Sequence, residues 1–331
     1  MHCLTSRRLG GVTFAAALLL SPSFLPAADI IGRYGGEFMA AGGGARSLAL
    51  GGACTSFSGD AWSLFWNPAG LADIRQREAA FMHSERFAGV VDYDVASLAI
   101  PQPDGSVHAI GFLRLGVNGI PLTRLEYPDQ PLSDRNRVEV DKVVSSGDYA
   151  LFIGKGEHYK RWRWGVAPKL IFRHVGSDLR AYGLGLDAGI GGRPIETLPI
   201  EAGIAARDQF STVLAWEQTG RKELIPSTVR LGLSGRLNLP MLEAALIPAA
   251  DFSYRFENLG GSDAAALQIG AEYLIRNTFA LRLGSDDGRM TFGGGLDLKP
   301  MSLDYAFIGH DDLGDTHRIS VIARWGGESV R

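Results

Sequence analysis

"KRWRWGVAPKLIFRHVG", residues 160–176, alternates apolar and charged side chains with a period of two. One face would carry Trp162, Trp164, Val166, Pro168, Leu170 and Phe172, and the other Arg161, Arg163, Lys169 and Arg173. This alternation is typical of a β-strand whose two faces meet different surroundings. The same pattern recurs in residues 225–238, where Arg230 and Arg236 lie opposite three aliphatic side chains. The basic residues of both segments are candidates for the wet side of a sheet.

Segments of this kind follow one another along most of the chain. Fourteen can be counted, near 78–88, 93–101, 106–117, 146–155, 160–174, 180–192, 198–210, 225–238, 244–257, 262–274, 276–284, 288–299, 301–309 and 315–325. A bacterial outer-membrane barrel needs an even number of strands of about ten residues, because each strand crosses hydrocarbon with its backbone fully paired. An antiparallel sheet in a soluble protein, with one face in a core, shows the same alternation. The even count favours an all-β fold, a 14-stranded antiparallel transmembrane β-barrel spanning residues 78–325.

The connections between these segments differ in length in an ordered way. Alternate connections are short, as at 102–105, 156–159, 193–197 and 299–300. The two longest, 118–145 and 211–224, both fall on the other side, where we expect loops. Outer-membrane barrels combine short periplasmic turns with longer outer loops. The connections therefore favour a barrel whose first strand runs outward.

Composition sets limits on location and partners. Residues 1–28 have the charged start, apolar run and small-residue end of a cleaved export signal. Loss of Arg7 and Arg8 with this segment leaves a net charge of −5, which gives no electrostatic reason to expect nucleic acid as a partner. Cys54 is then the only thiol, so we expect no disulfide framework. No later stretch has the ~20 apolar residues of a transmembrane helix.

"DAWSLFWNPAGLADI", residues 60–74, departs from the strand pattern. Asp60 can cap a short helix from Ala61, and Pro68 should end it near Trp66 or Asn67. The aromatic residues of this helix, Trp62, Phe65 and Trp66, would share one face. A 14-stranded barrel is too wide for its own side chains to fill. We therefore expect residues 29–77 to form a hatch that plugs the lumen; a periplasmic cap or a flexible arm is the alternative.

The two ends of the chain carry a resemblance. Residues 44–74 resemble the N-terminal signature of PorV/PorQ-type outer-membrane proteins, which are similar to the FadL-like (OMPP1/FadL/TodX-like) group, and residues 303–325 resemble the same group's C-terminal hairpin. The triplet Asn67-Pro68-Ala69, followed by Gly70, matches the triplet in the luminal hatch of FadL-like proteins. The resemblance implies a hatch-plugged barrel in the bacterial outer membrane, in contact with its lipid and inserted by the barrel-assembly machinery. One departure is the tail 326–331, since assembly signals usually close on a terminal aromatic.

The resemblance implies two different functions. FadL-like members pass hydrophobic small molecules sideways through a gap in the wall, whereas PorV-like members bind secreted protein cargo in a secretion system. Pro168 and Pro248 fall on lipid-facing positions, where proline cannot donate a ladder hydrogen bond, so each marks a possible wall opening or a simple bulge. A soluble exported β-protein with a binding role is a third hypothesis.

The sequence contains few patterns that indicate catalysis, cofactor binding or metal binding. No hydrolase, metalloprotease or nucleotide-binding motif occurs, and we expect neither an enzyme nor a cofactor. The acidic turns near 285–288 and 310–317 have oxygen ligands suited to hard cations, but solvated turns explain them better, so no metal site is predicted.

Overall fold

The computed structural model describes residues 37–326 apart from Ser58 and residues 87–88, 257–262 and 310–314. The predicted export signal and all but the first residue of the predicted tail lie outside the described residues. Within the described part, one antiparallel sheet contains every named strand and closes on itself, because the first strand pairs with the last from Arg77↔Trp325 to Glu85↔His317. Closure leaves no free sheet edge along the wall.

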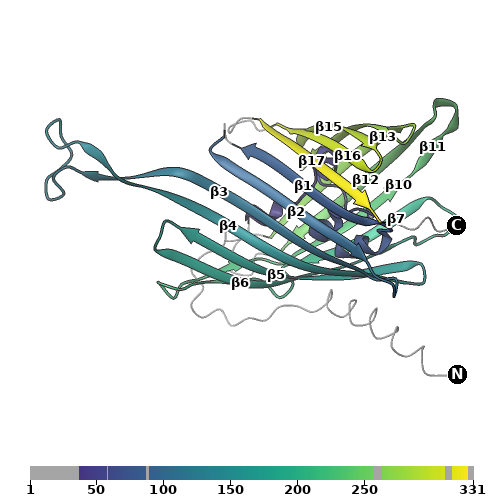
Figure 1. Ribbon diagram of the computed structural model, residues 1–331, viewed down its shortest axis with the longest axis horizontal. Helices are drawn as coiled ribbons and strands as arrows, with labels where there is room; N and C mark the ends of the chain where they lie inside the picture. Colours follow the sequence, from purple (N-terminus) through teal and green to yellow (C-terminus); the bar gives the residue numbers. More distant parts are fainter. Residues whose placement is uncertain (1–36, 58, 87–88, 257–262, 310–314, 327–331) are drawn as a thin grey trace, which may run out of the picture.

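The wall is built from seventeen strand segments. They are β1 (Arg77–Arg86), β2 (Val91–Pro101), β3 (Val107–Leu125), β4 (Val138–Tyr159), β5 (Trp162–Val175), β6 (Leu179–Gly192), β7 (Ile200–Arg207), β8 (Thr212–Trp216), β9 (Lys222–Ile225), β10 (Thr228–Gly235), β11 (Leu237–Leu239), β12 (Ala244–Arg255), β13 (Ala264–Ile275), β14 (Phe279–Asp286), β15 (Arg289–Leu298), β16 (Met301–Ile308) and β17 (Thr316–Trp325). A short 3-10 helix, η2 (Pro240–Leu242), follows β11. Because β7 and β8 form one wall strand and β9, β10 and β11 form another, the barrel has fourteen strands (Figure 1). The predicted fold class is confirmed.

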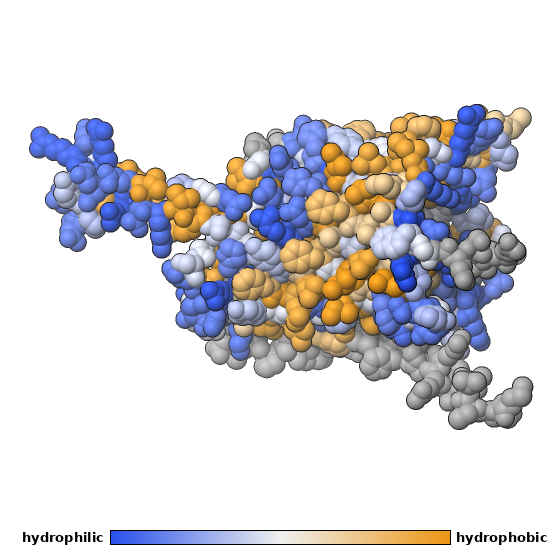
Figure 2. Space-filling model, viewed as in Figure 1, coloured by the Kyte–Doolittle hydropathy of each residue, from blue (hydrophilic) through white to orange (hydrophobic). Residues whose placement is uncertain are grey.

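The two faces of the wall differ as the alternation predicts. In β5, Leu170 is 54% exposed on the outside, whereas its neighbour Lys169 is 2% exposed on the inside. Figure 2 shows an apolar band across the middle of the barrel, with hydrophilic residues gathered toward its two ends. An outer surface of this kind would be unstable in water. The hypothesis of a soluble β-protein is therefore wrong, since the chain is a transmembrane barrel.

The longest predicted loop is not a loop. β3 and β4 continue to pair beyond the barrel as far as Leu125↔Val138, so only residues 126–137 turn. The last rungs that join this hairpin to its neighbours are Val91↔Val117 and Ser146↔Val175. The rest is a two-stranded arm, residues 118–145, which projects from the end of the barrel opposite the end of β17 (Figure 1). The expectation of a loop failed because several polar residues hide the alternation in this segment.

The second long connection also contains strands. Residues 211–224, predicted as a loop, form most of the hairpin of β8 and β9, with register Thr212↔Ile225 to Ala215↔Lys222. A break of four residues, 208–211, separates β8 from β7, and three of these residues have positive φ. Wall strand seven is therefore interrupted at residues 208–211 and continues as β8, where the sequence pattern predicts that the strand ends and a loop begins.

The segment before β1 lies inside the barrel. It contains α2 (Glu37–Ala40), α3 (Ala45–Ala49), α4 (Ser63–Trp66) and the 3-10 helix η1 (Pro68–Asp73). α3 packs against β14 to β17, and η1 packs against β3 to β6 on the other side. We call residues 37–76 the hatch. Among the described residues, no helix is long and apolar enough to span a membrane.

Candidate functional site: a sealed lumen with an outer cavity

Three aromatic residues of the hatch, Trp62, Phe65 and Trp66, were predicted to form a wedge against the wall, and all three are buried. Phe65 meets Phe152 of β4 edge to face, with ring centroids 5.1 Å apart. Trp66 donates from its indole nitrogen to the Gly43 carbonyl at 2.7 Å. The helix begins at Ser63, two residues later than predicted, because the Asp60 carboxylate accepts from the Trp62 amide at 3.0 Å and holds a turn there. The aromatic wedge joins hatch and wall.

Asn67 fixes the Asn-Pro-Ala-Gly segment against the wall. Its side-chain nitrogen donates to the Thr55 carbonyl at 2.8 Å and to the Ile190 carbonyl of β6 at 3.2 Å, and its side-chain oxygen caps η1 by accepting from Ala69. A Cβ at Gly189 would lie 1.9 Å from that oxygen. The wall therefore needs glycine where the hatch touches it.

Pro68 and Gly70 extend this close contact. A Cβ at Gly165 of β5 would lie 2.3 Å from the Pro68 carbonyl, and one at Gly70 would lie 2.7 Å from the Ser63 hydroxyl. All four motif residues, 67–70, are buried. Hatch and wall backbones thus meet without intervening side chains, which closes this part of the lumen.

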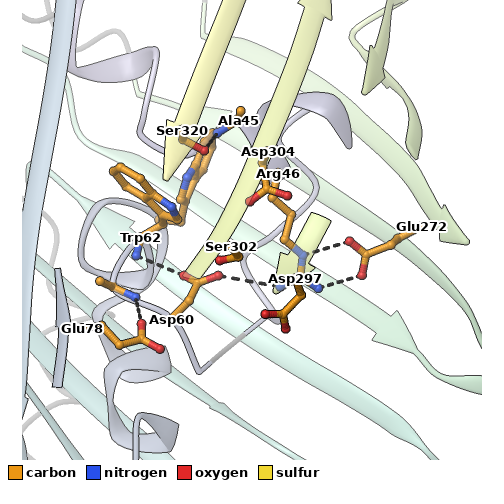
Figure 3. Close-up of polar contacts among 12 residues, drawn as sticks. Ala45, Arg46, Asp60, Trp62, Glu78, Glu272, Asp297, Ser302, Asp304 and Ser320 are labelled. Atoms are coloured by element: carbon orange, nitrogen blue, oxygen red, sulfur yellow. Dashed lines mark hydrogen bonds and ion pairs between the residues drawn. The ribbon is translucent and has the colours of Figure 1, made fainter. Parts of the chain in front are cut away.

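Ion pairs close the opposite side of the lumen. Arg46 of α3 donates through Nε and Nη2 to the two carboxylate oxygens of Glu272, both at 2.9 Å (Figure 3). Glu272 also accepts from Arg282 at 2.6 Å, and Arg282 reaches Asp304 at 2.7 Å. The nearby Glu272 carboxylate raises the pKa of Arg46 above its usual range, so the guanidinium stays charged. α3 is locked to β13 and β14 by charges that all have partners.

Further pairs tie the hatch to the wall. Arg324 donates to Glu78 at 2.9 Å, and the same carboxylate accepts from the Ala61 amide (Figure 3). On β12, the Asp251 carboxylate accepts from the amides of Cys54 and Thr55 at 3.1 and 2.9 Å. These bonds satisfy backbone groups that the irregular hatch would otherwise leave unpaired.

Four of the predicted lumen-facing basic residues point inward. Arg163 bonds the Ser56 carbonyl and pairs with Asp73 and Glu201, and Arg230 bonds the Gly52 carbonyl at 2.7 Å. Lys169 lies 2.7 Å from Asp187 and 2.9 Å from Asp208. Arg173 pairs with Asp148 and Glu223.

The other two predicted lumen residues are outside the lumen. Arg161 lies in the turn before β5 and pairs weakly with Glu196 at 3.8 Å, with half of its side chain exposed. Arg236 lies between β10 and β11 and bonds Asn238 and Asn277 at the exposed end of the barrel. The expected lumen positions are wrong for both, because Arg161 lies in a turn and Arg236 lies where the ladder is interrupted between β10 and β11.

A cavity of about 570 Å³ lies in the lumen on the outer side of the hatch. Trp66 forms part of its floor, with the guanidinium groups of Arg207 and Arg230 centred 4.9 and 5.2 Å from its ring centroid. Its apolar lining includes Met39, Leu48, Phe65, Phe152, Ile225 and Ile308. Its charged lining includes Arg86, Lys169, Asp187, Arg207, Asp208, Arg230, Arg255, Asp286, Asp287, Arg289 and Arg318. The cavity can hold a molecule that has both an apolar and a polar part.

The two prolines proposed as wall openings interrupt their ladders only briefly. Pro168 lies where the β4–β5 rungs jump from Phe152↔Lys169 to Lys155↔Val166, and Pro248 lies between the β10 and β11 rungs of β12. Both face outward and both retain a partner in register on their other side. Within the described wall they are local irregularities.

A longer interruption lies beside the cavity. The β6 rungs jump from Ala188↔Ala206 to Leu184↔Val213, which leaves residues 185–187 without ladder partners in wall strand seven. Asp208 and Gln209 partly close the interval, since their amides donate to the Asp187 carboxylate and the Leu186 carbonyl, both at 2.8 Å. We call residues 185–187 together with 208–211 the wall break. Lys169, Asp187 and Asp208 all line the cavity, so the break opens toward it.

Sequence reasoning missed several residues of this site. The sequence does not predict Arg46, Glu272 and Arg207 as site residues, because nothing in the local pattern distinguishes them from other charged residues. Arg318 lies on the charged face of its segment, and that register was the only available signal. The positive-φ residues Asp208, Phe210 and Ser211 are not glycines, so no turn signal marked the wall break.

Comparisons with known proteins support this architecture. No protein-family model and no curated protein matches the chain. Among solved structures, it resembles the Ralstonia pickettii toluene transporter TbuX with a TM-score of 0.59 at 12% identity, covering 86% of this chain and 99% of that one. It resembles the CymD monoaromatic hydrocarbon channel with a TM-score of 0.55 at 12% identity, and a mutant of the TodX monoaromatic hydrocarbon channel with 0.53 at 14%, each covering 86% of this chain and 98% of the other. The chain thus has the barrel fold of the TodX-like channels, as the resemblance of its ends implied.

Proposed function

We propose that this chain is a bacterial outer-membrane channel that passes hydrophobic small molecules and catalyses no reaction. The observation that carries the proposal is the cavity of about 570 Å³, which is closed by the hatch on one side and bordered by the wall break on another. Three structures with this fold are named as toluene or monoaromatic hydrocarbon channels. A solute entering from outside would reach the cavity, meet the hatch, and leave sideways into the membrane.

The wall break favours the sideways route over a straight one. The straight route requires breaking the bidentate Arg46–Glu272 pair and the hydrogen bonds of Asn67. The sideways route requires the cluster of Lys169, Asp187 and Asp208 to separate and the hydrogen bond from the Gln209 amide to the Leu186 carbonyl to open. Ladder hydrogen bonds are already missing there. An apolar solute leaving there passes directly into lipid.

The sideways route can be tested by closing the break with a reversible bond. A Cβ at Gly185 would lie 2.4 Å from the Thr212 hydroxyl, so the double variant Gly185→Cys/Thr212→Cys places two thiols next to each other across the break. Entry of radiolabelled toluene into cells is measured with wild type, with the oxidised variant, and with the same variant after reduction by dithiothreitol. We expect wild type to speed entry over cells lacking the barrel, oxidation to slow it at least tenfold, and reduction to restore it.

The outcomes separate two failures. If oxidised and reduced variants admit toluene equally fast, the exit is not at the wall break. If wild-type barrels admit no more toluene or other apolar probe than empty cells, the channel function itself is wrong.

The arm favours a second candidate function, that of a PorV-like secretion accessory which binds exported proteins. Beyond the last barrel rungs both edges of this ribbon are free, and unpaired strand edges can bind another extended chain. Its tip is ordered by Asn136, whose side chain bonds the carbonyls of Tyr127, Gln130 and Pro131 and the Tyr127 amide. Figure 1 shows this ribbon extending well clear of the barrel, where a cargo protein could reach it.

A deletion distinguishes this role from the channel role. Residues 118–145 are replaced by an Asn-Gly turn, and the full and shortened chains are cross-linked to proteins secreted by the same cells. The secretion role predicts cargo cross-links that disappear with the arm while toluene entry persists. If the full and shortened chains cross-link equally to secreted proteins, the arm does not bind cargo and the secretion role loses its support.

A further inference from the structure

The arm of residues 118–145 has two faces of different chemistry. Residues opposite each other in an antiparallel pair share a face, so one face carries the rungs Pro121↔Val143, Thr123↔Val140 and Leu125↔Val138. We call these six residues the apolar face of the arm. The rungs between them, Leu122↔Lys142 and Arg124↔Glu139, lie on the opposite face. Asp141, at the register shift, pairs with Arg124 at 3.4 Å, so the charges of this stretch gather on that opposite face.

The apolar face has no cover within the described chain. Val138, Val140 and Val143 are 54%, 59% and 63% exposed. The charged face does meet the barrel, since Lys142 lies 3.9 Å from Asp178 in the turn between β5 and β6. Figure 2 shows apolar residues along the part of the arm nearest the barrel and hydrophilic residues at its tip. A two-stranded ribbon is only marginally stable alone, and an exposed apolar patch marks an interaction site.

The hydrocarbon of the membrane does not cover this face. An outward-facing row of charges separates the arm from the apolar band of the wall. In this row the Asp94 carboxylate lies 2.7 Å from the His83 ring nitrogen and 2.9 Å from an Arg114 guanidinium nitrogen. Charges on the lipid face are costly inside hydrocarbon, so the row marks the outer limit of the acyl chains on this side. The arm starts beyond the row, at Asn118.

The apolar face looks toward neighbouring molecules in the same membrane. On β4 the side chains of Ile153 and Tyr149 point outward, and the strand alternates without an extra residue as far as Val143. A second copy inserted in the same direction presents the identical face at the identical height. A two-fold axis normal to the membrane brings the two faces together, with each residue near its own counterpart. The face carries no charge, so the two copies meet there without repulsion.

We propose that two copies of this chain associate through the apolar faces of their arms, which stack as two facing ribbons outside the membrane. The valines of one ribbon pack on those of the other, and the charged faces stay in water. This contact uses the face of the ribbon, whereas binding of cargo would use its edges. Self-association of this kind goes beyond the channel function and does not depend on it.

Disulfide formation tests the arrangement, because two cysteines bond only when their Cα atoms lie within about 7 Å. Val140→Cys and Glu139→Cys place a thiol on the apolar and on the charged face, one residue apart, in a chain that also carries Cys3→Ser. Outer membranes holding each variant are oxidised with copper phenanthroline and run on a non-reducing gel. We expect Val140→Cys to give at least about tenfold more disulfide-linked dimer than Glu139→Cys. The chain without an added cysteine should give none, since Cys54 is buried in the hatch.

An added charge tests the same contact independently. Val143→Cys should also form a dimer with itself, and the further change Val140→Glu brings two carboxylates together across the axis. We expect this charge to reduce the Val143→Cys dimer at least about tenfold. The matched control adds Glu139→Gln on the opposite face and should leave the dimer unchanged. Slower gel migration of boiled than of unboiled samples shows that each barrel is folded.

A benzophenone amino acid at position 140 identifies what covers the face in growing cells. A cross-linked product with the mass of two copies supports self-association. Cross-links only to an outer-leaflet glycolipid or to a secreted protein would overturn it. Equal dimer from Val140→Cys and Glu139→Cys would also overturn it, because chance encounters do not distinguish the two faces. Toluene entry is not measured in any of these experiments, so their failure leaves the channel function to its own test.

Discussion

The two halves of the lumen are lined by the same residue types but differ in how completely their arginines are paired. In the half that holds the hatch, Arg46, Arg163, Arg282 and Arg324 each have at least one carboxylate partner. In the outer half, Arg207 and Arg318 have neither a carboxylate partner nor a full set of hydrogen bonds among the described residues. Paired charges rigidify a seal, whereas a buried cation without a counter-charge costs free energy. Arg230 and Arg289 also line the outer half and are paired with Asp251 and Asp286, so the contrast between the halves rests on Arg207 and Arg318.

The largest effect should come from breaking the paired half. Glu272→Gln leaves Arg46 and Arg282 without their shared carboxylate, and removal of one partner of a buried ion pair costs about 3–5 kcal/mol. Unfolding by guanidinium in detergent, followed by tryptophan fluorescence, measures the loss. The control is Glu243→Gln, whose pair with Arg276 is exposed and should contribute less than about 1 kcal/mol. If the two variants lose similar free energy of unfolding, the buried ion pairs of the hatch half do not hold the hatch to the wall.

A smaller effect should follow from pushing the hatch off the wall. Gly189→Ala puts a methyl group 1.9 Å from the Asn67 side-chain oxygen, and overpacking of this kind costs about 1–3 kcal/mol. Displacement of the hatch should also raise single-channel conductance in planar bilayers. Gly235→Ala is the matched control, since its nearest neighbour would lie 3.6 Å away. Unchanged conductance in Gly189→Ala would show that the hatch does not seal through Asn67.

Chemical labelling of Cys54 can show whether the hatch is closed without changing the contacts between hatch and wall. Burial, together with the nearby Asp251 carboxylate, raises the pKa of the Cys54 thiol above its ordinary value. The thiol therefore stays neutral, and reaction needs the thiolate. In a chain carrying Cys3→Ser, we expect maleimide to label Cys54 very slowly at pH 8, and quickly once Gly189→Ala or denaturant releases the hatch. Rapid labelling of the folded parent chain would contradict a closed hatch.

The smallest effect on stability is expected in the unpaired half. Arg207→Gln removes a charge that forms no ion pair with a carboxylate of the described residues, so the free energy of unfolding should change by less than about 1 kcal/mol or rise. The same denaturation experiment measures it, beside Glu272→Gln. A loss as large as that of Glu272→Gln would remove the contrast between the halves, because Arg207 would then be structural.

The periodicity of the sequence and the lengths of its turns were enough to predict the barrel. In segments such as 160–174 one face is apolar and the other charged, which explains why the strand number was predicted correctly. The side chains of Lys169 and Arg230 are buried on the inner face of the wall. Errors arose where the local pattern ended, as at Arg161 in a turn, at Arg236 between β10 and β11, and at the arm of residues 118–145. The sequence singled out the Asn-Pro-Ala-Gly segment through its resemblance to a hatch motif, but it did not predict the close approach of this segment to Gly165 and Gly189.

By itself, then, the sequence determined a closed wall of fourteen two-faced strands and an aromatic segment too irregular to join it, because alternation and turn chemistry are local properties of the chain. Only the tertiary structure decided which charges meet, since Arg46 and Glu272 are 226 residues apart and their pairing depends on barrel closure around the hatch. It also decided where the ladder breaks, at residues 208–211 beside Asp187 and Lys169. A charged residue carries no sign of its partner until the fold brings the two together.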